Sequence, residues 1–209
     1  MSHIAYPVPR GIILVIRTDD AAEALLLGRA ALQAGVDAVE VTLTVPGAVD
    51  VIRKLAADGA TVGVGTVLKA SDVRAAVRSG ASFVVAPNTN PDVITAAHDE
   101  GVAMVAGGMT PTEIQHAHQI GSDAIKVFPA GSMGGPQYIR ELSGPLPHIP
   151  YVISGGVSLA NASEYLRADA LAICVGRAMF PVDAVKRRDA NQLADAARRF
   201  VAVAHESTE

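Results

Sequence analysis

The feature that most constrains the fold is a repeat of short apolar runs, each followed by an Ala-rich stretch of helical character. Small-residue turns such as Ala-Gly, Asp-Gly and Ser-Gly restart the pattern. Most runs are rich in Val and Ile without polar alternation, which is typical of parallel strands covered on both faces. The eight runs are Gly11–Arg17, Asp37–Leu43, Ala60–Gly65, Ser82–Ala86, Ala103–Ala106, Ala124–Phe128, Tyr151–Ile153 and Ala170–Val175.

Helix-start signals lie between the runs, where side chains that cap a helix N-terminus are followed by helix formers. They are Thr18-Asp19-Asp20 (with Gly35 as the stop of the same helix), Ser71-Asp72, Asn90-Pro91-Asp92, the capping box Thr110-Pro111-Thr112-Glu113, and Ser158.

Eight strand-then-helix units predict an α/β fold of the (β/α)8 barrel class, also called a TIM barrel. An open doubly wound sheet is the competing architecture, but it usually has fewer strands, and no G-x-G-x-x-G follows the first run. We expect one barrel domain over residues 1–209, with a short N-terminal lead at 1–10 and a C-terminal helical tail at about 182–205.

Composition excludes several classes of protein. Hydrophobic residues make up 50% and charged residues 18%, which excludes intrinsic disorder. A net charge of −4 and 4% aromatics speak against nucleic acid as a partner. A single cysteine, Cys174, cannot form an intramolecular disulfide. With no apolar run of membrane-helix length and no signal-peptide pattern, we expect a cytoplasmic chain without a membrane partner.

Polar residues at the ends of the apolar runs are the candidates for function, because active sites of such barrels lie at the C-terminal ends of the strands. Arg17, Glu40, Thr66, Asn88, Lys126, Ser154 and Arg177 occupy these positions. They predict a ring of polar groups around one mouth of the barrel.

Lys126 is the sharpest of these signals, because the chain has four lysines and only this one lies inside an apolar run. Burial disfavours the charged ammonium. A neutral amine is a nucleophile toward a ketone, as in Schiff-base enzymes. The alternative is a buried lysine that pairs with a carboxylate for structure.

Glu40 is the matching carboxylate inside another run. Formation of an imine and its conversion to an enamine both require proton transfers, which a carboxylate near the lysine can perform directly or through water. Alternatively, Glu40 is a structural partner of Lys126 or Arg17.

Glycines in the last two units indicate an anion site. Ser154-Gly155-Gly156 and Gly176-Arg177 each run from a strand end toward an expected helix start. Glycine lets backbone N–H groups approach a phosphate, and a helix N-terminus adds positive potential. Arg177 would add a bidentate contact. The alternative is that these glycines serve tight turns with positive φ.

No cluster of His, Asp and Glu ligands appears at the strand ends, so we expect no metal and no other cofactor. His116 and His118 are not spaced as a metal-binding pair on one helix face. Cys174 is expected to pack in the core.

Several segments in series resemble the family of 2-keto-3-deoxy-6-phosphogluconate (KDPG) and 4-hydroxy-2-oxoglutarate (KHG) aldolases. The resemblance covers residues 10–180. The matching segments are Val39–Thr44, Val62–Leu68, Met109–Glu113, Ile125–Ala130, Gly134–Tyr138 and Ser154–Val157.

The resemblance implies a homotrimeric barrel and a metal-independent class I aldolase, a lyase of carbohydrate metabolism of the Entner–Doudoroff type. The implied reaction cleaves KDPG to pyruvate and glyceraldehyde 3-phosphate through a Schiff base on Lys126, with Glu40 as general acid and base. The remaining implied substrate contacts are Arg17 and Thr66 at the pyruvyl carboxylate, Pro87 and Phe128 around the imine, and Ser154, Gly155, Gly156 and Gly176 at the phosphate.

The chain departs from the family pattern at four places. Many members have Arg where this chain has Thr44, and Arg17 is expected to replace it. Members usually have Pro-Gly at Ala106-Gly107 and often Ser at Arg177, whereas Asn88 resembles the 6-phosphogalactonate aldolases. The alternatives are therefore a KHG aldolase, a 2-keto-3-deoxy-6-phosphogalactonate aldolase or, more distantly, a phosphosugar isomerase on the same barrel.

Overall fold

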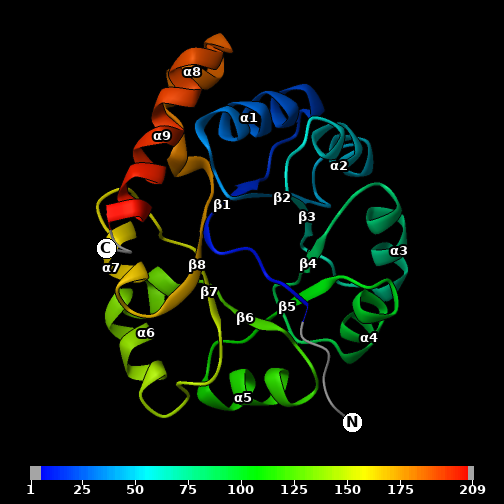
Figure 1. Ribbon diagram of the computed structural model, residues 1–209, viewed down its shortest axis with the longest axis vertical. Helices are drawn as coiled ribbons and strands as arrows, with labels where there is room; N and C mark the ends of the chain where they lie inside the picture. Colours follow the sequence, from blue (N-terminus) through cyan, green and yellow to red (C-terminus); the bar gives the residue numbers. More distant parts are fainter. Residues whose placement is uncertain (1–5, 207–209) are drawn as a thin grey trace.

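The computed structural model describes residues 6–206 and shows a closed barrel of eight parallel strands, in the order of the sequence (Figure 1). The strands are β1 Gly11–Ile16, β2 Ala38–Thr42, β3 Val62–Gly65, β4 Phe83–Val85, β5 Ala103–Gly107, β6 Ala124–Val127, β7 Tyr151–Ser154 and β8 Ala170–Val175. Because β8 pairs with β1, the sheet closes on itself. The predicted (β/α)8 barrel is confirmed, and the open sheet is excluded.

Helices surround the barrel, as Figure 1 shows, with α9 running past α1. They are α1 Ala21–Ala34, α2 Ala48–Ala57, α3 Ala70–Arg78, α4 Pro91–Asp99, α5 Pro111–Gln119, α6 Pro136–Ser143, α7 Ala162–Leu166, α8 Val182–Arg187 and α9 Ala190–Glu206, with 3-10 turns η1 Ala130–Met133 and η2 Arg177–Met179. Within residues 6–206, none of these helices has the length and apolarity needed to cross a membrane.

Three of the predicted helix starts are confirmed by their capping contacts. The Asp20 side chain accepts a hydrogen bond from the backbone of Ala22, and Asn90 caps α4 in the same way. Thr110 and Glu113 form the expected reciprocal capping box at α5. Gly35 ends α1 in the left-handed conformation.

Two predicted helix starts are wrong. Helix α3 begins at Ala70, one residue before Ser71. Helix α7 begins at Ala162 rather than after Ser158, because Asn161 closes a turn in between. Its side chain accepts from the Ser158 backbone N–H at 2.8 Å and donates to the Gly156 carbonyl at 2.9 Å.

The apolar core has two layers. A larger cluster fills the space between strands and helices, and a smaller one fills the inside of the barrel around Ile13, Phe83, Val105 and Val152. Gly63 makes room for the Phe83 ring, since a Cβ there would lie 2.3 Å from that ring. The interior is therefore packed below the level at which the polar residues begin.

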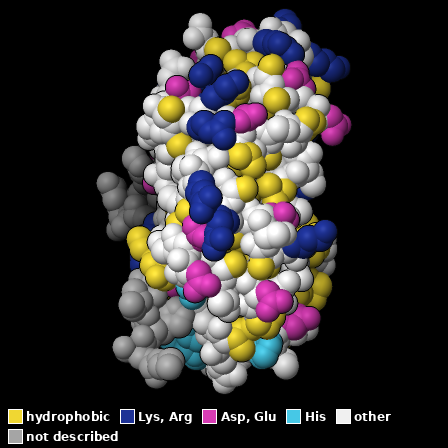
Figure 2. All heavy atoms as spheres, turned by 90° about the vertical axis from the view of Figure 1, so that its right-hand side faces the viewer, with side chains coloured by type: hydrophobic (Ala, Val, Ile, Leu, Met, Phe, Trp, Pro, Cys, Tyr) yellow, Lys and Arg dark blue, Asp and Glu magenta, His cyan; other side chains and the backbone are white. Residues whose placement is uncertain are grey.

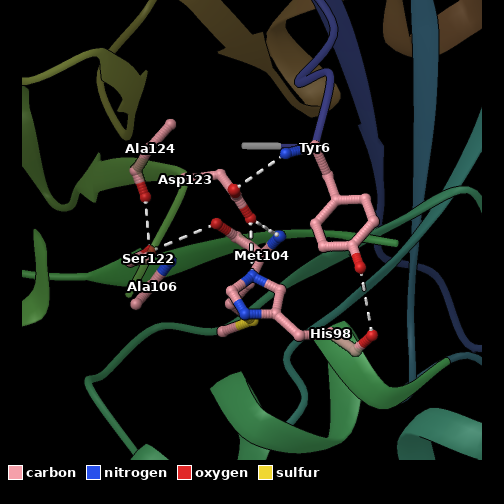
Figure 3. A network of polar contacts seen from close by, with 7 residues as sticks. All are labelled: Tyr6, His98, Met104, Ala106, Ser122, Asp123 and Ala124. Atoms are coloured by element: carbon pink, nitrogen blue, oxygen red, sulfur yellow. Dashed lines mark hydrogen bonds and ion pairs between the residues drawn. The ribbon is translucent and has the colours of Figure 1, made fainter. Parts of the chain in front are cut away.

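A polar network lies at the end of the barrel where the strands β5 and β6 begin, opposite the end where the strands stop (Figure 3). The Asp123 carboxylate, whose side chain is buried, accepts hydrogen bonds from the backbones of Tyr6 at 3.0 Å and Met104 at 2.8 Å, and its other contact is His98 Nε2 at 2.9 Å. The Tyr6 hydroxyl donates to the His98 carbonyl at 3.3 Å. The network ties the chain before β1 to α4 and β6.

The outer surface mixes charges of both signs. On the face shown in Figure 2, Lys and Arg side chains lie beside Asp and Glu side chains. The structure contains surface ion pairs such as Arg29–Asp58 and Arg74–Glu100.

Candidate active site

Lys126 and Glu40 meet inside the barrel, although they come from strands on opposite sides of it. Glu40 lies on β2, in register with Val15 and Gly63, and Lys126 lies on β6, in register with Gly107 and Val152. The Lys126 Nζ lies 3.6 Å from the Glu40 Oε1. Their relative exposures are 5% and 0%, so the pair is shielded from bulk solvent.

The Glu40 carboxylate is buried with hydrogen-bonding capacity unused. Neither of its oxygens accepts a hydrogen bond from a residue in the described part of the chain. The Lys126 ammonium is slightly beyond hydrogen-bond distance. Buried polar atoms are nearly always paired in folded proteins, so unpaired carboxylate oxygens suit a group that meets a bound molecule.

Gly65 provides the space that the Glu40 side chain occupies. A Cβ at position 65 would lie 2.0 Å from the Glu40 Oε1, closer than any real contact. Gly63 and Gly65 are two positions apart on β3, so they face the same side of the sheet. Gly63 makes room for Phe83, and Gly65 makes room for Glu40. The Val-Gly-Val-Gly segment is thus a local requirement of the site.

Arg17 lies over the same mouth and is fixed by two hydroxyls. Its Nη1 donates to the Thr44 Oγ1 at 3.0 Å, and its Nη2 donates to the Thr66 Oγ1 at 2.9 Å. The Thr44 and Thr42 hydroxyls share a hydrogen bond of 2.8 Å, and Thr42 donates onward to the Ile16 carbonyl at 2.9 Å. The guanidinium of Arg17 therefore extends to position 44, where many members of the resembling family have an arginine.

The backbone of Thr66 is strained. Its φ is 60°, in the left-handed region that a β-branched residue rarely adopts. Such strain is retained where the surrounding structure enforces it, and it concentrates at functional sites. Here the strained backbone aims the Thr66 hydroxyl at Arg17.

A cavity of about 480 Å³ joins these groups. Of the eleven catalytic and substrate-binding residues predicted from the sequence, ten line it, and Glu40 lies beside Lys126. The ten are Arg17, Thr66, Pro87, Lys126, Phe128, Ser154, Gly155, Gly156, Gly176 and Arg177. The Phe128 ring centroid lies 5.6 Å from the Lys126 Nζ.

Cys174 packs inside the barrel as expected, but it also lines this cavity, which the sequence reasoning missed. Burial raises the pKa of the Cys174 thiol to about 12, with a further increase from the Glu40 charge and an opposing effect of Lys126. The thiol is therefore protonated at neutral pH. Its position on β8, two residues before Gly176, was the available signal.

The glycine end of the cavity differs from the prediction. Gly155 and Gly156 have φ of 85° and 79°, and Cβ atoms on them would lie 3.0 and 2.9 Å from Pro129 and Gly131. These two glycines therefore serve a tight turn packed against the loop after β6. The expected helix N-terminus beside them is wrong, since α7 begins six residues after Gly156 and has five residues.

Gly176 is also not followed by a regular helix, because Arg177–Met179 forms a short 3-10 turn. Its φ of −94° lies outside the left-handed region. Anion contacts at this end would come from single backbone N–H groups and side chains.

Asn88 lies outside this cavity. It lines a neighbouring cavity of about 370 Å³ that shares Pro87 and Phe128 with the first and also borders Glu113 and His116. Hydrogen bonds from the Thr110 and Met109 backbones hold the pKa of Glu113 below its usual value. Within residues 6–206, no group of three or more His, Cys, Asp or Glu side chains is arranged to hold a metal ion.

Known proteins have a similar fold and a related sequence. The family model of the KDPG and KHG aldolases matches residues 9–196. A 2-dehydro-3-deoxy-phosphogluconate aldolase of Pseudoalteromonas atlantica is 32% identical over 91% of this chain and 88% of its own. A solved structure described as "Native KDPGal structure" has a TM-score of 0.85 and 30% identity, covering 98% of this chain and 99% of the other.

A designed, cube-shaped protein cage made by fusing symmetric oligomeric domains also matches. Its TM-score is 0.84 at 31% identity, covering 96% of this chain and 74% of the cage chain. The family match extends over most of the chain and includes every strand of the barrel. The chain therefore belongs to the family of KDPG and KHG aldolases.

Proposed function

We propose that this aldolase cleaves KDPG to pyruvate and glyceraldehyde 3-phosphate through a Schiff base on Lys126, with Glu40 as the proton shuttle. The observation that carries the proposal is the buried Lys126–Glu40 pair, 3.6 Å apart, at a cavity of about 480 Å³. A buried amine next to a carboxylate that accepts no hydrogen bond from the described residues suits imine chemistry, which needs a nucleophile and a proton shuttle.

The first stage forms the imine. Glu40 takes a proton from the Lys126 ammonium, and the neutral amine attacks the C2 ketone of the substrate. Glu40 then returns the proton to the carbinolamine oxygen, which leaves as water.

The second stage breaks the C3–C4 bond. The C4 hydroxyl gives its proton to Glu40, directly or through water, and the bonding electrons flow into the iminium to form an enamine. The aldehyde leaves. Protonation of the enamine at C3 and hydrolysis of the imine release pyruvate and restore Lys126.

Arg17 and Thr66 are proposed to bind the carboxylate of the pyruvyl part. The two hydroxyl contacts of Arg17 are neutral, so its charge remains available to an anion. Pro87 and Phe128 also line the cavity, and we propose that they pack around the imine.

Ser154, Gly155, Gly156 and Gly176 are proposed to contact the phosphate. All four line the cavity at the ends of β7 and β8. Recurrent phosphate sites of this barrel class occupy the same loops.

The 6-phosphogalactonate stereoisomer of KDPG is the second candidate substrate. The similarity to the structure described as "Native KDPGal structure", which extends over nearly the whole of both chains, favours it. KHG is the further alternative within the family.

We also propose that the enzyme needs no cofactor, acts as a homotrimer and is cytoplasmic. The similarity to a cage built from symmetric oligomeric domains supports an oligomer. Leu68, after β3, and Met133, in η1 after β6, are exposed apolar side chains that a second copy would cover. A chain with one cysteine needs no oxidising compartment.

Pyruvate release from KDPG, its galactonate isomer and KHG tests the proposal. We expect KDPG to be cleaved with the highest kcat/KM, and Lys126→Ala to abolish cleavage of all three. Full activity of Lys126→Ala would contradict the mechanism. Preference for the galactonate isomer would reassign the configuration at C4, and preference for KHG would reassign the aldehyde.

A further inference from the structure

A second arginine, Arg177, lies at the mouth of the active-site cavity and forms only a long ion pair with Glu23. Its Nη1 lies 3.9 Å from the Glu23 Oε1, beyond hydrogen-bond distance, and its side chain is 63% exposed. Exposed ion pairs of this kind contribute little to stability, so the arginine can leave Glu23 at small cost.

Glu23, by contrast, is held in place independently of Arg177. The Thr18 hydroxyl donates to the Glu23 Oε1 at 2.9 Å. Glu23 also lies in the first turn of α1, where a negative charge is favoured by the helix dipole. The carboxylate is therefore the fixed partner and the guanidinium the movable one.

Arg177 and Arg17 both border two hollows. Each lines the active-site cavity, and each also lines a smaller apolar hollow beside α1 that includes Glu23. Arg177 thus lies where it can contact either Glu23 or a molecule in the active-site cavity.

The charges around the cavity suit a substrate with two anionic ends. Arg17, Lys126 and Arg177 line it, whereas Glu40 lies next to Lys126, with its Oε1 3.6 Å from the Lys126 Nζ. In the described residues, Arg17 has no carboxylate within ion-pair distance. One arginine is thus available to the pyruvyl carboxylate and the other to a second anion.

We propose that Arg177 is the residue that selects a substrate with a phosphate ester remote from the ketone, and that it exchanges Glu23 for this phosphate on binding. The inference rests on the proposed aldolase function. A guanidinium binds a phosphate through two parallel charge-assisted hydrogen bonds, which a carboxylate at 3.9 Å does not receive.

The test compares KDPG with unphosphorylated 2-keto-3-deoxygluconate, using pyruvate release as the readout. In Arg177→Ala we expect the ratio of kcat/KM for the two substrates to fall about 10- to 100-fold, mainly through the KM for KDPG, as for a lost charge-assisted contact. Arg177→Lys should recover part of the ratio, because it keeps the charge but not the bidentate geometry.

Arg188→Ala is the matched control. Arg188 pairs with Asp20 at the start of the same helix, its side chain is 62% exposed, and it does not line the cavity. The control should keep the wild-type ratio.

Glu23→Gln provides an independent test of the exchange. Removing the competing carboxylate should lower the KM for KDPG about two- to fivefold, the range of an exposed ion pair. Asp20→Asn, which retains a capping side chain, should not change it.

An unchanged or increased substrate ratio in Arg177→Ala would overturn the inference, and so would a raised KM for KDPG in Glu23→Gln. If wild type cleaves KDPG but the ratio does not respond, only this inference fails. If wild type releases no pyruvate from either compound, the proposed function fails instead.

Discussion

The Lys126 Nζ and the Glu40 Oε1 face each other at 3.6 Å across the interior of the barrel. The two side chains come from β6 and β2, so closure of the sheet is what brings them together. Neither carboxylate oxygen accepts a hydrogen bond from residues 6–206, so the carboxylate can exchange protons with the amine and with a bound substrate.

The first prediction concerns this carboxylate. Glu40→Gln keeps the shape but cannot accept and return a proton, so kcat should fall by about 10²–10⁴. Steady-state pyruvate release measures the effect. Glu113→Gln changes a carboxylate outside the cavity and should retain near-wild-type kcat. Activity within threefold of wild type in Glu40→Gln would contradict its proposed role.

A second prediction concerns Gly65, whose missing side chain leaves the space that the Glu40 carboxylate occupies. A methyl group there would meet the Glu40 Oε1 at 2.0 Å, so Gly65→Ala must displace the carboxylate from Lys126. We expect kcat to fall at least about tenfold, as for a misplaced catalytic group. Gly144→Ala, whose Cβ would make only an ordinary contact at 3.6 Å, is the control. Full activity of folded Gly65→Ala would show that Glu40 need not stay where it is.

Replacing Thr66 should affect the stability of the fold and the binding of substrate differently. Thr66→Gly relieves a φ of 60°, which costs of the order of 1–3 kcal/mol, and this gain offsets the flexibility of glycine in the unfolded chain. The variant also loses the hydroxyl that holds Arg17. Urea unfolding should show no loss of stability, whereas the KM of the substrate should rise. A less stable variant with an unchanged KM would refute this interpretation of Thr66.

Glu113 should make the stability of the fold depend on pH. Its pKa is lowered by hydrogen bonds from the Thr110 and Met109 backbones, so the charged form is favoured in the folded state. This contribution is present above the unfolded-state pKa of about 4.3 and is lost as the pH falls through the lower folded-state value. In urea titrations, the stability advantage of wild type over Glu113→Gln should therefore shrink as the pH is lowered from neutral to below about 4.3. A difference that stays constant would argue against the capping box as its source.

Cys174 should be inert in the native enzyme. Its thiol lies beside Glu40 and Lys126 with a pKa of about 12, so almost none is thiolate at neutral pH. Mass spectrometry after iodoacetamide treatment should find it unmodified in folded protein and alkylated in denaturant. Stoichiometric alkylation of the native state would show that the thiol is more accessible than its 3% exposure indicates.

The sequence sufficed for the barrel, because its Val- and Ile-rich runs are long enough to define each strand within two residues. The proximity of Lys126 and Glu40 could also be predicted, because a charged residue in a strand covered on both faces must face the inside of the barrel or another polar group. The sequence did not suffice where tertiary contacts decide local structure. The Asn161 side chain delays the start of α7, and Glu23 approaches Arg177 across more than 150 positions.

The central claim is that Lys126 forms the covalent intermediate, and reductive trapping tests it most directly. Wild-type enzyme should be incubated with pyruvate and borohydride, digested, and analysed by mass spectrometry. The account predicts a reduced pyruvyl adduct on the peptide that contains Lys126, and none in Lys126→Ala. An enzyme that releases pyruvate from its substrate yet forms no adduct, or forms it on Lys54, Lys69 or Lys186, would contradict it.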